Sequence, residues 1–535
     1  MHIEKIKSPA DLRALDQDQL EELCREIREF LVDAVSRTGG HLGSNLGAVE
    51  LTIAVHRVFE SPRDVILWDT GHQAYVHKLV TGRADMFSSL RQRHGLSGYP
   101  SNTESEHDIV ENSHASTSLS WASGLSAGFD LTGHKHRQVV AVIGDGSMTG
   151  GMAFEALNNL GHYGQRAVII LNDNGRSYAP TVSRLATVMS RVRQSPNYVK
   201  GRQAVVNILD RMPLGEEVKR GLSGAAAAMR EMWEPPAFFE TLGVRYLGPI
   251  DGHDIEALES ALSDASSYED GPIVVHVLTD KGRGYAPAED DEEKHLHDIG
   301  LFDPATGNSS SASGKNFTSE FSNSLLTIAE RRPDVVAITA AMPGSTGLLP
   351  FQQRYPDRFF DTGIAEQHAL TSAAGMARAG LRPFVAIYST FLARGFDQVM
   401  YDIGLHGLPV VICIDRAGVT GPDGASHHGV HDIAMYARVP GMTIFSPSSL
   451  QELPVMMNQA LETNGPVAIR WPRGTADESS VVGQGLSARL VRDGQDVAIL
   501  AAGKMLKAAT SAAELLAEEG VDAAVWDPRL LKPLD

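Results

Sequence analysis

The sequence predicts an α/β protein made of two α/β units with mainly parallel sheets, followed by part of a third α/β domain. Short runs of β-branched and aliphatic residues alternate with longer helical patterns along most of the chain, which is typical of parallel sheets. Nearly all of these runs end in Gly, Asp, Asn, Ser or Arg. Because ligands bind outside the carboxyl ends of parallel strands, the polar residues after each run are the candidate functional residues.

Charges interrupt the apolar positions of residues 1–31, so we expect this segment to form an amphipathic helix and not a signal peptide. The expected strands follow it in chain order. They include runs within residues 138–146, 166–174, 272–280, 335–341, 383–390, 408–418, 442–448, 466–474 and 496–503.

The domain boundaries are predicted from composition. Residues 304–316 are rich in Gly, Ser and Asn and lack apolar periodicity, which indicates a linker. The three predicted units are residues 1–303, 317–482 and 483–535. In the last unit we expect a strand within 496–503, a helix at 508–520 and a second strand at 522–531. Since these elements cannot cover both faces of a parallel sheet, we expect this domain to be cropped from a longer one.

The charge balance argues against some classes of partner. The chain has 47 Lys and Arg against 66 Asp and Glu, a net charge of −19, so nucleic acid and anionic lipid are not expected partners. No apolar stretch is long enough to span a bilayer. The two cysteines, Cys24 and Cys413, form neither a disulfide framework nor a metal-binding pair, which favours a reducing, cytoplasmic location.

A metal and diphosphate site is expected after two of the strands. Asp145 lies in a Gly-Asp-Gly-Ser segment, and Asn174 follows 29 positions later, one helix and one strand further on. Both can therefore place hard oxygen ligands at neighbouring strand ends, which suits Mg²⁺. Gly146 and Ser147 are expected to open the following helix, whose N–H groups favour an anion. Taken alone, such a segment is more often an ordinary tight turn.

The stretch GDGSMTGGMAFEALNN, followed by LNDN, resembles the thiamine-diphosphate signature of transketolase-like enzymes. The resemblance implies thiamine diphosphate and Mg²⁺ as cofactors. It also implies Asp145 and Asn174 as metal ligands, with the carbonyl of Arg176 as a third.

The activating carboxylate is expected in the second unit. Glu366, in DTGIAEQHA, is expected in a short loop that enters a helix. On local evidence it is a surface residue that compensates the helix dipole. In the family context, a carboxylate on the pyrimidine nitrogen lets the cofactor remove its own thiazolium proton. Phe391 resembles the aromatic residue that stacks on the pyrimidine, and its alternative is a core residue. The cofactor must then bridge both units.

Further segments resemble the 1-deoxy-D-xylulose-5-phosphate synthase family, among them GGHLGSNLGAVELT, WDTGHQAYVHKLVTGR, KGRGYAPAE and DRAGVTGPDGASHHG. The cofactor contacts implied by this resemblance are His72, Ser113, His114, Ala115, Gly146, Ser147, Tyr285 and Glu366. Ser113 and Ala115 differ from the residues at the corresponding positions of the usual GHSST motif of the family. His41 and His72 can act as acid or base near neutral pH, and each can equally be a structural histidine. Lys281 can neutralise diphosphate or be solvated.

Substrate phosphate needs fixed positive donors, which Arg416 and Arg473 can supply after two strands of the second unit. For each arginine alone, a surface ion pair is the alternative. By resemblance, Tyr388, Arg394, Asp423 and His427 line the acceptor site, and His297 reaches the active site from the end of the first unit. The residues expected to be catalytic are Glu366, His41, His427, His297 and Asp423.

The resemblance implies a homodimeric enzyme that condenses pyruvate with D-glyceraldehyde 3-phosphate, releasing carbon dioxide and 1-deoxy-D-xylulose 5-phosphate. Two alternatives stay open. A transketolase-type enzyme would transfer a ketol group between sugar phosphates, and a non-catalytic protein would bind thiamine diphosphate without turnover.

Overall fold

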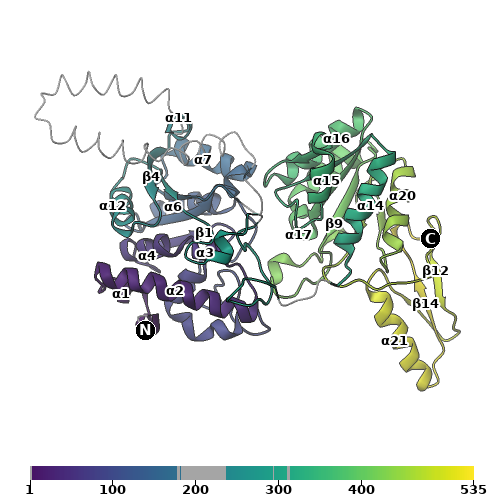
Figure 1. The fold of residues 1–535 in the computed structure, drawn as a ribbon. Helices are drawn as coiled ribbons and strands as arrows, with labels where there is room; N and C mark the ends of the chain where they lie inside the picture. Colours follow the sequence, from purple (N-terminus) through teal and green to yellow (C-terminus); the bar gives the residue numbers. More distant parts are fainter. Residues whose placement is uncertain (1–2, 177–180, 182–235, 293, 310–313) are drawn as a thin grey trace, which may run out of the picture. The chain divides into compact units, whose positions relative to one another are not determined.

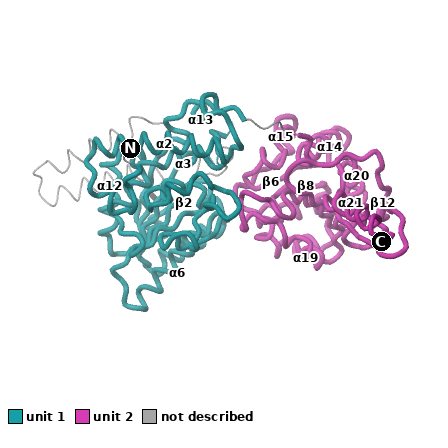
Figure 2. The backbone as a smooth tube through the Cα atoms, turned by 90° about the horizontal axis from the view of Figure 1, so that it is seen from below, with its two compact units in different colours: residues 1–311 teal, residues 312–535 magenta. Residues whose placement is uncertain are grey.

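The computed structural model describes residues 3–176, 181, 236–292, 294–309 and 314–535 (Figure 1). The chain divides into two compact units, unit 1 with residues 1–311 and unit 2 with residues 312–535 (Figure 2). The division falls inside the predicted linker, part of which, residues 310–313, lies outside the described residues.

Unit 1 is built on a five-stranded parallel sheet with the strand order β1-β2-β3-β5-β4. The strands are β1 (Val65–Trp68), β2 (Val139–Gly144), β3 (Val168–Asp173), β4 (Arg245–Asp251) and β5 (Ile273–Leu278). The helices are α1 (Pro9–Leu12), α2 (Gln17–Thr38), α3 (Gly43–Leu46), α4 (Val49–Val58), α5 (Tyr75–Lys78), α6 (Ser118–Leu131), α7 (Gly151–Tyr163), α11 (Pro236–Thr241), α12 (Ile255–Ser266) and α13 (Ala286–Glu289).

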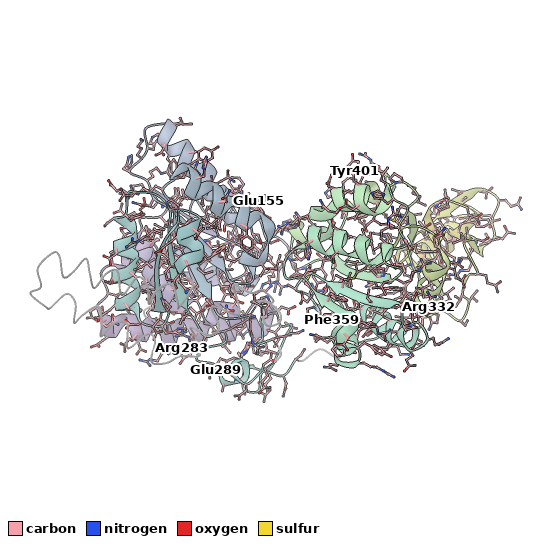
Figure 3. All side chains as sticks on the ribbon, turned by 90° about the horizontal axis from the view of Figure 1, so that it is seen from above. Glu155, Arg283, Glu289, Arg332, Phe359 and Tyr401 are labelled. Carbon is pink, nitrogen blue, oxygen red and sulfur yellow. The ribbon has the colours of Figure 1, made fainter. Side chains whose placement is uncertain are left out.

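Both faces of β1, β2, β3 and β5 are buried, which explains why these four strands are almost continuously apolar, whereas the edge strand β4 is partly exposed. Alternate residues of β1, β2 and β3 pack against α6 and α7 on one face and against α4 and α12 on the other. Glu155, labelled in Figure 3, is exposed on α7, whose Ala153, Leu157 and Leu160 are buried. The amphipathic helix predicted within residues 1–31 is confirmed in part as α2, which begins only at Gln17 and whose apolar side belongs to a separate core.

Unit 2 is built on a seven-stranded sheet with the order β15-β10-β11-β9-β8-β6-β7, parallel except for β15. The strands are β6 (Val335–Thr339), β7 (Phe359–Asp361), β8 (Arg382–Tyr388), β9 (Val411–Asp415), β10 (Thr443–Phe445), β11 (Val467–Arg470) and β15 (Leu530–Lys532). The helices are α14 (Phe317–Arg331), α15 (Leu349–Arg354), α16 (Glu366–Arg378), α17 (Ser389–Leu392), α18 (Phe396–Gln398), α19 (Asp432–Tyr436), α20 (Glu452–Glu462) and α21 (Met505–Glu518). Helices α14, α15 and α20 pack on one face of the sheet and α16 on the other.

The C-terminal segment differs from the prediction. It forms a three-stranded sheet of β12 (Arg489–Arg492), β14 (Ala523–Asp527) and β13 (Val497–Leu500), with α21 packed on one face. The single strand expected at 522–531 is wrong, because the chain turns at Arg529, where φ is 56°. Beyond this turn, β15 pairs antiparallel with β10 of the larger sheet.

Arg529 holds this turn in place. Its side chain is fully buried, donates a 2.9 Å hydrogen bond from Nε to Glu452 and donates from Nη1 to the carbonyls of Gln484, Gly485 and Ser487. The segment that joins the two sheets of unit 2 is therefore anchored to α20. Among the helices that the structure describes, none combines the length and apolarity needed to cross a membrane.

Candidate active site

The predicted metal ligands lie at one corner of the sheet of unit 1. Asp145 directly follows β2, and Asn174 directly follows the neighbouring parallel strand β3. The backbone N–H of Asn174 lies 3.4 Å from Oδ1 of Asp145, and the Thr181 hydroxyl donates to Oδ2 at 2.6 Å. The expected proximity of the two strand ends is confirmed.

The donor chemistry of this corner fits Mg²⁺. Asp145 is buried and supplies a carboxylate, while Asn174 supplies an amide oxygen that accepts a 3.1 Å bond from the N–H of Arg176. Within the described part of the chain, no group of three His, Cys, Asp or Glu side chains could hold a metal. A site here therefore depends on amide and carbonyl oxygens beside Asp145, and the ligand roles of Asn174 and Arg176 stay predictions.

Gly146 and Ser147 do not open the long helix as expected. Ser147 begins one turn of 3-10 helix, Ser147–Thr149, and α7 starts only at Gly151. Gly150 separates the two because its backbone is extended, with φ −74° and ψ 137°. The backbone N–H groups that follow Gly146 therefore belong first to this short turn and not to α7.

Three of the predicted histidines form one cluster. The ring centroids of His41 and His72 are 5.5 Å apart, those of His41 and His297 are 5.7 Å apart, and those of His72 and His297 are 4.9 Å apart. Paired backbone hydrogen bonds of 2.9 Å between Gly40 and Ile299 bring the two distant segments together. Close packing continues at Gly43, where a Cβ would lie 1.9 Å from the carbonyl oxygen of His295.

Lys281 adds a positive charge beside this cluster. Its Nζ lies 2.6 Å from Nδ1 of His297, and both side chains are buried. Burial lowers the pKa of Lys281 to about 7, although the nearby Asp145 carboxylate opposes the shift. Burial, together with Lys281 and the other two histidines, also holds the pKa of His297 well below its ordinary value. Burial and the neighbouring charges therefore favour the neutral form of His297, and Lys281 loses its proton more readily than an exposed lysine.

The remaining predicted cofactor residues of unit 1 lie on two further segments. Ser113 and Ala115 are buried and His114 is half-buried, just before α6. Tyr285 is half-buried before α13, and its hydroxyl donates a 2.8 Å bond to the carbonyl of Pro304. That bond ties the tyrosine to the start of the predicted linker, and its contact with a cofactor stays a prediction.

In unit 2, Glu366 is the first residue of α16 and not part of a loop before it, so the helix begins earlier than expected. The side chain is buried, and Nη1 of Arg394 lies 3.6 Å from its Oε2. No described residue forms a hydrogen bond to that Oε2. Burial raises the pKa of Glu366, and Arg394 limits the rise. A buried carboxyl with an unsatisfied oxygen fits a role in which a bound pyrimidine nitrogen completes its hydrogen bonding.

The other predicted residues of unit 2 form two groups. In the first group, the Arg416 guanidinium lies 4.3 Å from the ring centroid of Tyr388, Tyr388 stacks on Phe391 at 5.6 Å, and Phe391 meets His427 edge-on at 5.3 Å. In the second group, Arg473 is exposed and forms an ion pair with Asp423. This is the arrangement that the surface-pair alternative describes, and a phosphate-binding role for Arg473 stays a prediction.

Sequence reasoning missed several partners of these residues. Asp415 pairs with Arg416 at 2.8 Å and accepts a 2.8 Å bond from the Thr318 hydroxyl. The pairing of Arg394 with Glu366 was also not expected. Asp415 could have been predicted from the sequence, because it is a carboxylate at the end of an apolar strand. Asp145 directly follows such a strand and was predicted.

Comparisons with known proteins place the chain in a family. Residues 3–279 match the sequence model described as 1-deoxy-D-xylulose-5-phosphate synthase, residues 314–477 match the transketolase pyrimidine binding domain, and residues 486–535 match the transketolase C-terminal domain. The 1-deoxy-D-xylulose-5-phosphate synthase of Mycolicibacterium paratuberculosis is 50% identical over 99% of this chain and 85% of its own length, and that of Mycobacterium avium matches equally well.

Among solved structures, the transketolase of Campylobacter jejuni aligns with 97% of this chain and 89% of its own, at 17% identity and a TM-score of 0.39. The sequence matches extend over almost the full chain and meet the site residues in both units. The chain therefore belongs to the 1-deoxy-D-xylulose-5-phosphate synthase family of thiamine-diphosphate-dependent transferases.

Proposed function

We propose that this protein condenses pyruvate with D-glyceraldehyde 3-phosphate, releasing carbon dioxide and 1-deoxy-D-xylulose 5-phosphate, the first step of the non-mevalonate route to isoprenoids. The observation that carries the proposal is the buried Glu366, whose unsatisfied oxygen and raised pKa occur in a chain of this family. Thiamine diphosphate, when bound, supplies a nucleophilic carbon for pyruvate and takes up the electrons released on decarboxylation.

In unit 1, the proposed residues bind the metal ion, offset the charge of the diphosphate or transfer protons. Asp145 and Asn174 would bind Mg²⁺, and the carbonyl of Arg176 would complete the protein ligands. Lys281 would offset diphosphate charge at pH values where it is protonated. His41, His72 and His297 would donate or accept protons at substrate oxygens, because a neutral imidazole has both a donor and an acceptor nitrogen.

In unit 2, Glu366 would share a proton with the pyrimidine nitrogen, and burial, which raises its pKa, favours the protonated form that this exchange needs. Phe391 would stack on the pyrimidine, since its ring is held between Tyr388 and His427. Arg394, Arg416 and Arg473 would bind the acceptor phosphate. Each faces a carboxylate in the structure, so the phosphate must compete with Glu366, Asp415 and Asp423.

The test is a product assay with purified protein, thiamine diphosphate and Mg²⁺. Carbon dioxide release from labelled pyruvate that requires D-glyceraldehyde 3-phosphate, with one 1-deoxy-D-xylulose 5-phosphate formed for each carbon dioxide, supports the proposal. Ketol transfer from xylulose 5-phosphate without pyruvate consumption would instead assign a transketolase activity. If calorimetry shows that the cofactor binds but neither the condensation nor the ketol transfer occurs, the protein would be non-catalytic.

Mg²⁺ itself, a homodimer and a cytoplasmic location also belong to the proposal. The free, buried cysteines Cys24 and Cys413 support a reducing compartment. Sedimentation equilibrium tests the dimer, and omission of the metal from the assay, with Mn²⁺ and Ca²⁺ as comparisons, tests the requirement for Mg²⁺.

A further inference from the structure

A buried carboxylate that the proposed mechanism does not use lies directly after β1. Asp69 is only 2% exposed. Its Oδ1 accepts a 2.8 Å hydrogen bond from the N–H of Ser116, and its Oδ2 accepts a 3.0 Å bond from the N–H of Ser118. These N–H groups lie at the start of α6, where the N-cap residue Thr117 provides no side-chain cap. Asp69 therefore caps a helix from a different element.

Ser116 extends this connection to a second segment. Its side chain is fully buried, and its hydroxyl donates a 2.7 Å bond to the carbonyl of Ser147. Its φ is 74°, in the left-handed region, which a serine occupies only when its surroundings hold it there. The bonds to Asp69 and to Ser147 provide that restraint.

The main chain of Asp69 holds a third segment. Its carbonyl accepts a 2.6 Å bond from the N–H of Gly71 and a 3.1 Å bond from Nε2 of Gln73, the two neighbours of His72. One residue thus touches the turn that carries His72 and the segment that carries Ser113 to Ala115. Through Ser116 it also reaches the turn of Gly146 and Ser147.

We propose that Asp69 is a positioning residue of the thiamine-diphosphate site, acting through Ser116 to fix the relative placement of these three segments. The inference rests on the proposed function, since the three segments are those expected to contact the cofactor. Asp69 itself touches no reacting atom in this scheme. Its loss should misplace donors for the cofactor more than it unfolds the protein.

The chain offers a matched control at the other end of the same strand. Asp64 directly precedes β1, is also 2% exposed and also accepts two backbone bonds, from Glu60 at 2.9 Å and from Gln138 at 3.0 Å. It differs from Asp69 in one further partner, the half-exposed Arg63, which donates to its Oδ2 at 3.1 Å. It lies at the amino end of a parallel strand, away from the ligand edge. Asp64→Asn therefore reproduces the loss of a buried, backbone-capping carboxylate without touching the predicted site.

The experiment compares Asp69→Asn, Asp64→Asn and the unaltered protein. Asparagine keeps the size of aspartate but turns a donor toward one of the two N–H groups. The dissociation constant of thiamine diphosphate is measured calorimetrically at saturating Mg²⁺, and the melting temperature is measured without cofactor. For Asp69→Asn, the dissociation constant should rise by about 10- to 100-fold, the range typical of residues that orient a binding group. For Asp64→Asn, only the melting temperature should fall.

Ser116→Ala keeps the experiment decisive if Asp69→Asn fails to fold. It removes only the bond to the Ser147 carbonyl and should raise the same dissociation constant several-fold with little change in melting temperature. Unchanged affinity in the foldable variants, or an equal loss of affinity in Asp64→Asn, would overturn the positioning role. Failure of the unaltered protein to bind thiamine diphosphate would be a different result, because it would overturn the proposed function itself.

Discussion

Nζ of Lys281 lies 2.6 Å from Nδ1 of His297 inside unit 1, at a distance where the two groups cannot both be positively charged without strong repulsion. Burial is the larger reason that the pKa of Lys281 falls to about 7. The lysine expected to neutralise diphosphate charge is therefore in balance between its charged and neutral forms at physiological pH.

Affinity for thiamine diphosphate should consequently depend on pH. Below pH 7 Lys281 is already protonated, whereas above pH 7 the lysine must take up a proton when the anion binds. Affinity should then fall by up to about tenfold for each further pH unit. In Lys281→Met the affinity should be lower at pH 6 and the pH dependence shallower. Calorimetric titrations between pH 6 and 9 measure both, and an identical slope in the two proteins would contradict the assignment.

Glu366 and Asp145 should separate catalysis from metal binding. Glu366→Gln removes the exchangeable proton but keeps the size of the side chain, so kcat should fall by about 100-fold or more. In Glu366→Gln, Mg²⁺-dependent binding of the cofactor should survive.

Asp145→Asn should have the opposite effect. Because it removes a proposed Mg²⁺ ligand, Mg²⁺-dependent binding of the cofactor should be lost. Product formation and calorimetry on both variants provide the comparison, and near-normal turnover by Glu366→Gln would refute the role given to that residue.

A buried charge network should carry much of the stability of unit 1. Asp108 accepts a 2.8 Å bond from His77 and two bonds, of 2.7 and 2.8 Å, from Arg83. Asp108→Ala removes the nearer counter-charge of the buried Arg83 and leaves it only Glu104, at 3.5 Å, which should cost about 3–5 kcal/mol of unfolding free energy. Denaturant unfolding followed by circular dichroism measures the loss.

The matched control for this network is an exposed ion pair. Arg332, labelled in Figure 3, pairs with Asp334 at 2.6 Å on the surface of unit 2. Asp334→Ala should cost less than about 1 kcal/mol, because solvent screens exposed pairs. Equal losses of unfolding free energy in Asp108→Ala and Asp334→Ala would show that burial does not determine how much an ion pair contributes to stability.

Glu50 should make the protein sensitive to acid. Burial alone would raise the pKa of this carboxyl, but hydrogen bonds from His253 and Arg28 outweigh it and hold the pKa at about 2. Since the folded value is depressed, the stabilisation is present above the ordinary value of 4.5 and is lost as the pH falls toward 2. The loss should amount to roughly 3 kcal/mol. Glu50→Gln should show a flatter stability profile between pH 5 and 3, measured by urea unfolding at each pH.

The elements that the sequence predicts best are local ones. Most strands of both central sheets are buried on two faces, so their apolar runs are visible without any knowledge of tertiary contacts. Strands β1, β4 and β7 were not among the predicted ones, and β4 and β7 are partly exposed. The spacing of Asp145 and Asn174 likewise reports one helix and one strand, and the structure places both at the same sheet edge. The turn at Gly150 was not visible, since an extended glycine inside a helical pattern leaves no periodic signal.

Contacts between distant segments could not be derived from pattern alone. The meeting of His41 with His297 depends on the backbone pairing of Gly40 with Ile299, and no local periodicity encodes it. Family resemblance named these histidines, while residue types alone left a structural role equally open. The ion pair of Arg394 with Glu366 could not be predicted either, because neither residue stands out in the local sequence pattern of its own helix.

Strand β15 has a consequence for any attempt to shorten the chain. The match to the transketolase C-terminal domain begins at residue 486, yet β15 completes the sheet to which β10 belongs. A cut between the two matched domains would strip the partner from an apolar edge, Thr443–Phe445, and leave Glu452 buried without Arg529. Such an open edge invites pairing with another copy of the chain, so the shortened protein should form fibrous or amorphous precipitate and not a free-standing catalytic core.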